Sequence, residues 1–105
     1  MNTVEVLEAA RELIADPEHW TQGVYAKSAL GLPIGPSAPG AVCWCAEGAM
    51  RKVTGDGPDG PWWDAFLAVS KLTPQGLIRW NDDRTHAEVL AKFDEAIAAA
   101  KASHE

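Results

Sequence analysis

The chain has 105 residues, 47% of them hydrophobic, which is enough for one domain with a single modest core. Fifteen acidic residues against nine scattered basic ones give a formal net charge of −6, which argues against a nucleic-acid ligand. No apolar run is long enough to span a membrane and the N-terminus lacks a secretion-signal pattern, so we expect a cytoplasmic protein without membrane attachment.

The chain begins with a pattern typical of an amphipathic helix. Between residues 2 and 16 the apolar side chains recur at helical spacing, and the charged ones fall on the opposite face. Asn2 and Glu5 have the form of a capping box, and Pro17 ends the helix. From residue 18 to 40 the pattern breaks. There we expect a short β-hairpin with arms at 23–27 and 32–34, turning around Ser28 to Gly31.

The segment from Gly40 to Met50 combines two thiols, an indole and several small residues. The small residues predict close approach of another backbone segment, and Trp44 supplies a large rigid face. We expect a second helix that begins at Pro39 or Ala41, runs through Val53 and ends at Gly55. Residues two apart in a helix point to nearly opposite sides, so this helix would separate Cys43 from Cys45.

The two cysteines have two possible roles. The C-x-C spacing and the scattered histidines do not form a zinc-binding pattern, so no metal is expected. In one interpretation Cys43 lies in the first turn of the second helix as an activated nucleophile. In the other, both cysteines are small buried apolar side chains, and Cys43 is mostly buried and unreactive. The apolar neighbours of Cys43 favour the second.

A third helix is expected from Pro61 to about Leu72, capped by Asp59. Its apolar residues cover more than one side, and because Trp62 and Trp63 are adjacent, one of them should be partly exposed. Exposed tryptophan is a typical anchor of protein interfaces, so this helix predicts contact with a protein partner or a second copy of the chain.

The last helix is expected to follow the capping box formed by Thr85 and Glu88 and to continue to about Ala102. Just before it lies a dense polar cluster of Asn81, Asp82 and His86. In a thiol enzyme, His86 would act as the base for Cys43, with Asn81 or Asp82 orienting its ring. Helix capping and loop hydrogen bonding explain the same residues without catalysis.

Three blocks of the sequence resemble a family of small bacterial and phage domains that has no assigned function. The blocks are W-T-Q-G at 20–23, C-W-C-A-E-G-A at 43–49 and W-N-D-D-R-T-H-A-E-V-L-A-K-F-D-E-A-I at 80–97. The resemblance covers most of the chain and implies a small intracellular protein, but it brings no catalytic residues.

These observations predict a single mainly α domain over residues 1–105, with about four helices and an irregular or hairpin insertion after the first. We expect a binding or regulatory protein that needs no cofactor and acts on a protein partner or small ligand, with a homodimer as one possibility. The alternative is a small thiol enzyme using Cys43, His86 and Asn81 or Asp82. The expected binding residues are Trp44, Trp62, Trp63, Trp80, Asn81, Asp82 and His86.

Overall fold

The computed structural model describes residues 2–55 and 61–103. Within these ranges the chain forms five α-helices, one short 3-10 helix and two short strands. In order they are α1 (Thr3–Leu13), η1 (Pro17–His19), β1 (Ala26–Ser28), β2 (Ala41–Trp44), α2 (Ala46–Thr54), α3 (Trp62–Ser70), α4 (Leu77–Asp82) and α5 (His86–Ser103). The expectation of a mainly α domain with a small β insertion after the first helix is confirmed.

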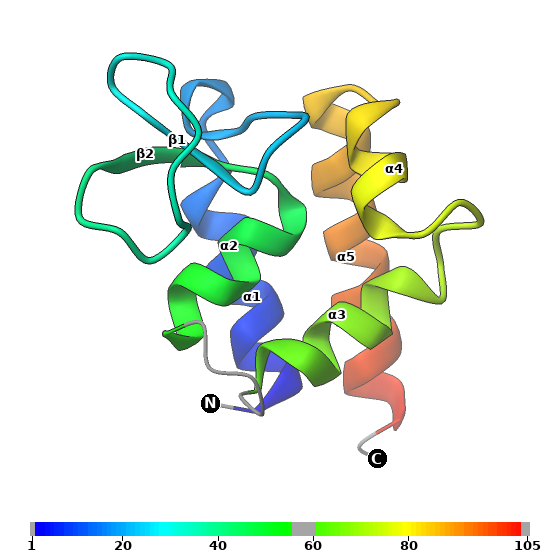
Figure 1. Ribbon diagram of the computed structural model, residues 1–105. Coiled ribbons are helices and arrows are strands. Elements are labelled where there is room, and N and C mark those ends of the chain that lie inside the picture. Colours follow the sequence, from blue (N-terminus) through cyan, green and yellow to red (C-terminus); the bar gives the residue numbers. More distant parts are fainter. Residues whose placement is uncertain (1, 56–60, 104–105) are drawn as a thin grey trace.

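Helix α1 packs against α2, α3 and α5 and forms the centre of the helical part. In Figure 1 the strands and their loops lie on one side of the molecule, α4 and α5 lie on the other, and α1 and α2 lie between them. The fully buried side chains of this core include Leu7 and Ile14 from α1 and its end, Met50 from α2 and Phe93 from α5. No helix in the described ranges has the length and apolar character needed to cross a membrane.

Both predicted capping boxes are present. The Asn2 side chain accepts a hydrogen bond from the backbone N–H of Glu5, whose carboxylate accepts one from the Asn2 N–H. Thr85 and Glu88 are joined in the same reciprocal way. Helix α1 ends earlier than expected, at Leu13, because Asp16 and Pro17 start the separate helix η1. The proposed cap Asp59 lies outside the described residues.

The β region differs from the prediction in its pairing. The expected turn at Ser28 to Gly31 is present, with Gly31 N–H donating to the Ser28 carbonyl at 2.9 Å. Its second arm pairs with β1 through a bridge between Lys27 and Pro33 and through backbone hydrogen bonds from Ser28 to Leu32 and from Ile34 to Ala26. On its other side β1 pairs antiparallel with β2, a pairing that the sequence did not predict. The prediction that a helix begins at Pro39 or Ala41 is therefore wrong. Residues 41–44 are extended, and α2 begins only at Ala46.

Candidate functional site

Three segments that are distant in sequence meet at the side chain of Asn81, which is 1% exposed. Its Oδ1 accepts hydrogen bonds from Trp20 Nε1 at 2.9 Å and from the Ala46 backbone N–H at 3.1 Å. Its Nδ2 donates to the Thr21 carbonyl at 3.2 Å. One amide thus joins the segment after η1, the first residue of α2 and helix α4. We call this arrangement the Asn81 junction.

Residues 22 and 23 extend the Asn81 junction to the end of α4. The Gln22 amide lies within hydrogen-bonding distance of the carbonyls of Asn81 and Asp82, the last two residues of α4, and of Arg84 just beyond the helix. The backbone N–H of Gly23 donates to Asp82 Oδ1 at 2.8 Å, and Asn81 Nδ2 donates to the same oxygen at 3.2 Å. These two bonds fix the orientation of the Asp82 carboxylate.

The first turn of α2 lies directly against the backbone of Tyr25. The Cys45 N–H donates to the Tyr25 carbonyl at 3.1 Å, and a Cβ on Gly48 would overlap that carbonyl oxygen. Only glycine leaves room for this contact. The prediction that small residues in this stretch allow close approach of another backbone segment is confirmed, and the approaching segment is the one that leads into β1.

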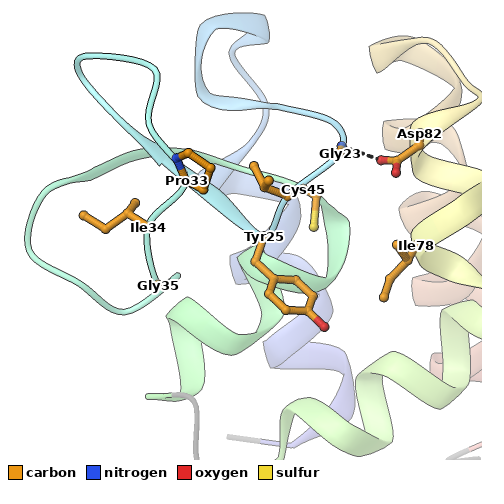
Figure 2. A pocket seen from close by; sticks show the side chains of 9 residues that line it. Gly23, Tyr25, Pro33, Ile34, Gly35, Cys45, Ile78 and Asp82 are labelled. Atoms are coloured by element: carbon orange, nitrogen blue, oxygen red, sulfur yellow. Dashed lines mark hydrogen bonds between the residues drawn. The ribbon is translucent and has the colours of Figure 1, made fainter.

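A pocket of about 550 Å³ opens between the segment before β1, the N-terminus of α2 and helix α4. Figure 2 shows the Cys45 thiol above the Tyr25 ring, with the Ile78 side chain across from both and the Asp82 carboxylate next to Gly23. Most of the wall is apolar, and Asp82 contributes its single charged side chain. The lining residues are Gly23, Val24, Tyr25, Pro33, Ile34, Gly35, Cys45, Ile78 and Asp82.

The two other ionisable groups in the pocket stay neutral at pH 7. Burial raises the pKa of the Cys45 thiol to about 11, against smaller opposing effects of hydrogen bonds from the backbone of Gly48 and Glu47. Burial also raises the pKa of the Tyr25 phenol, and the nearby Glu47 carboxylate raises it further. Glu47 is itself buried and is paired with Arg51 at 3.0 Å. The pocket therefore presents a thiol, a phenol and one carboxylate.

The structure gives the two cysteines different positions from those predicted. Cys43 lies in β2, where it pairs with Lys27, and is partly buried. Cys45 is the buried residue, and it is the N-cap of α2, where its sulfur accepts the Gly48 N–H at 3.3 Å. The placement of Cys43 in a first helical turn is wrong because the backbone up to residue 44 is held in the sheet.

His86 contacts α1 and η1 rather than a thiol. Its Nε2 lies 2.6 Å from the Ile14 carbonyl oxygen, and its ring packs against Trp20 with a centroid distance of 5.6 Å. Among the described residues, no hydrogen bond joins His86 to Cys43. Nor do the described His, Cys, Asp and Glu side chains gather in groups of three or more that could hold a metal ion.

The four tryptophans named as binding residues do not line this pocket. Trp44 is buried, with its Nε1 donating to the Pro36 carbonyl at 2.9 Å. Trp62 and Trp80 are also buried, Trp62 beneath the Arg51 guanidinium at 3.9 Å and Trp80 near Arg84 and Lys92. Trp63 is 47% exposed. The prediction that one of the adjacent pair Trp62 and Trp63 is exposed is confirmed.

Of the residues expected to bind a ligand, only Asp82 lines the pocket. Sequence reasoning missed Tyr25, Cys45 and Ile78 as lining residues. One feature of the sequence could have indicated Ile78. It is an apolar residue shortly before the polar cluster that begins at Asn81, so it could lie beside that cluster in the fold. Tyr25 and Cys45 had none, since their approach depends on the contact between Gly48 and the Tyr25 carbonyl.

Comparisons with curated proteins and with solved structures gave no match to the chain. A family model described as a family of unknown function (DUF6197) matches residues 1–99. That range includes all three sequence blocks, and their residues Trp20, Thr21, Ala46 and Asn81 are those that meet at the Asn81 junction. Because the match covers nearly the whole chain, the protein belongs to the DUF6197 family.

Proposed function

We propose that the protein is a binding protein and that its pocket takes a compact apolar group bearing an amine or another cation. The observation that carries this proposal is the combination of an apolar pocket of about 550 Å³ with one carboxylate held in a fixed orientation. Sites for small ligands are typically mostly apolar, with a few well-placed polar groups that orient the ligand.

The state of the Asp82 carboxylate supports a cationic ligand. Its Oδ1 already accepts two hydrogen bonds from the protein. Within residues 2–55 and 61–103, no hydrogen bond reaches its Oδ2. An ammonium group at the pocket rim would gain a charge-assisted hydrogen bond from this oxygen, and Pro33, Ile34 and Ile78 would cover its hydrocarbon part.

Binding is favoured over thiol catalysis by the chemistry of Cys45, the cysteine in the pocket. A catalytic thiol needs a lowered pKa and a base within reach. Here burial raises the pKa of Cys45 to about 11, and its sulfur already serves as a helix cap. The thiol is therefore better suited to shaping the pocket than to attacking a substrate.

We further propose a bacterial or phage origin and a place in the cytoplasm, as the resemblance of the three sequence blocks implies, and a regulatory role, which the small size, the five tryptophans and the negative charge favour. Both cysteines are free thiols, which suits a reducing compartment.

The test uses benzylamine as the probe. Its binding is monitored by the NMR chemical shifts of the protein's backbone amides and side chains. We expect saturable shifts at Gly23, Val24 and Ile78 with millimolar affinity, because about 0.5 kcal/mol for each of the eight heavy atoms of benzylamine amounts to about 4 kcal/mol. Benzyl alcohol should bind more weakly, and phenylacetate should not bind, because its charge repels Asp82.

Asp82→Asn should abolish the preference for the amine. The matched control is Asp64→Asn, which makes the same chemical change at an exposed residue of α3 that lines no part of the pocket. Equal shifts with the amine and the carboxylate, or none at the pocket residues, would contradict the proposal.

A further inference from the structure

A second hollow adjoins the pocket on the other side of Ile78. It has a volume of about 650 Å³ and lies between α3 and α4, with Phe66 and Ser70 on one wall and Arg79 and Asp83 on the other. Ile78 and Asp82 line both hollows. The two depressions are thus neighbours along one surface, with the Asp82 carboxylate where they meet.

We propose that the two hollows form one groove, which binds an extended segment of a partner polypeptide carrying a Lys or Arg between apolar side chains. This inference rests on the proposed function and names its ligand: the cation in the pocket is a side chain of the partner. An extended chain directs every second side chain to the same face, about 7 Å apart, so one segment can fill two adjoining hollows.

The exposed apolar side chains along the groove support a ligand long enough to reach across both hollows. Tyr25 is 40% exposed in the first hollow, and Ile78 is 47% exposed between the two. Trp63 stacks on Phe66, with centroids 5.2 Å apart and planes inclined by 17°, and carries the apolar surface beyond the second hollow. A small molecule filling one hollow would leave most of this surface in water, whereas a peptide of several residues would cover it.

Charge complementarity favours a basic segment. Asp82 and Asp83 face the groove against one lining cation, Arg79, and the whole chain has a formal charge of −6. Such a surface steers positively charged segments toward it and repels acidic ones. A second copy of this chain would present the same acidic groove and the same net charge, so it is the less suitable occupant.

Recognition in this groove depends on side chains rather than on addition of a strand. The edge of β2 that faces away from β1 is paired with residues 20–21, since Thr21 N–H donates to the Trp44 carbonyl at 3.0 Å. The edge of β1 is occupied by residues 33–34, since Ile34 N–H donates to the Ala26 carbonyl at 3.1 Å. With both edges paired, an added strand would have to displace the protein's own backbone.

The experiment selects phage-displayed random 12-residue peptides against the full chain and measures the affinity of labelled winners by fluorescence anisotropy. We expect enrichment of one Lys or Arg flanked by apolar residues. Asp82→Asn should weaken these peptides about tenfold, the size expected for one partly desolvated ion pair. Asp64→Asn, the matched control, should leave the affinity unchanged.

Two variants test whether the peptide spans both hollows. Ser70→Phe fills the second hollow, and Asp83→Asn removes a charge that lines only that hollow. Both should weaken the peptides while leaving benzylamine binding unchanged. Because Asp83 is exposed, its substitution tests the span even if Ser70→Phe disturbs folding.

The outcomes separate this inference from the proposed function. Suppose that benzylamine binds at Asp82 but no basic peptide is enriched, or that substitutions in the second hollow leave peptide affinity unchanged. The peptide-binding groove is then contradicted, and the proposal of a cation-binding pocket is retained. If the selected peptides are acidic, or the protein self-associates through this face in sedimentation experiments, the inference is overturned. If benzylamine fails as well, both proposals fall.

Discussion

The helical core and the Asn81 junction hold different sets of elements together by different means. In the core, the largest buried side chains are apolar, with Phe93, Leu7 and Met50 fully enclosed. In the junction, a single buried amide makes hydrogen bonds to Trp20, Thr21 and Ala46. Burial of apolar area is nondirectional, whereas hydrogen bonds require defined positions of both partners.

This difference separates stability from placement of the site. The core brings α1, α2, α3 and α5 together and would tolerate apolar substitutions of similar volume. The junction determines where the segment before β1 lies relative to α4, and both of these parts contribute walls of the pocket. Damage to the core should therefore unfold the protein, and damage to the junction should also alter the pocket.

The largest expected effect is in the core. Phe93→Ala should lower the free energy of unfolding by about 3–5 kcal/mol, because it leaves a cavity where the ring was fully enclosed. The measurement is urea unfolding followed by circular dichroism. Phe66→Ala is the matched control and should cost less, since Phe66 is only partly buried and stacks on the exposed Trp63. Equal losses would mean that α5 packs no more tightly than α3.

The next effect breaks the junction. Asn81→Asp keeps an acceptor for Trp20 and Ala46 but replaces the amide donor to the Thr21 carbonyl with a charged oxygen beside Asp82. We expect a loss of about 2–4 kcal/mol at pH 7, measured by urea unfolding. Asn2→Asp makes the same change at an exposed helix cap and should cost almost nothing, since Asp caps helices as well as Asn.

The loss in Asn81→Asp should depend on pH. The introduced carboxyl has a folded-state pKa raised by burial above its unfolded value of about 3.9. The loss of folding stability caused by its ionisation is therefore absent below the pKa of the unfolded state. It grows as pH rises toward the pKa of the folded state. The difference from the original protein should be smaller at pH 4 than at pH 7. A pH-independent difference would show that the substituted side chain has turned out into solvent.

The sequence predicts the core better than the junction because of the distance between interacting residues. The capping boxes at Asn2 and Thr85 join residues three apart, so a local pattern reveals them. Asn81 bonds to residues 35 and 60–61 positions away, and nothing near it in the sequence identifies those partners.

Two elements, α4 and β2, differ from the prediction for physical reasons. Helix α4 has only six residues, too few for an apolar period to appear, and it was not predicted. The sequence pattern predicts a helix start where the structure has β2, because the four residues before α2 fit a helix as well as a strand. Its extended form depends on hydrogen bonds to β1 and to Thr21, which are separated from it in sequence.

The contact between α2 and the Tyr25 backbone gives a smaller effect. Gly48→Ala should destabilise the protein by about 1–3 kcal/mol, although alanine favours a helix by about 1 kcal/mol over glycine. The overlapping atom is a backbone oxygen, so a segment of the pocket wall must move. The control is Gly35→Ala, where a Cβ meets no atom within 4 Å and should change little. A stabilised Gly48→Ala variant would show that the two segments separate easily.

The smallest expected effect comes from the thiol at the edge of the junction. Burial raises the pKa of Cys45 from an unfolded value near 9 to about 11 in the folded protein. A raised folded-state pKa contributes stability that is fully present below the unfolded value and is lost as pH rises toward the folded one. Between pH 7.5 and 9.5 this loss amounts to about 1 kcal/mol.

Cys45→Ala should therefore lose less stability over that interval than Cys43→Ala, which keeps the buried thiol. The measurement is the difference between the two pH slopes in urea unfolding, so groups common to both variants cancel. Equal slopes would mean that the Cys45 thiolate reaches water in the folded state, and the pocket would then open more readily than its hydrogen bonds imply.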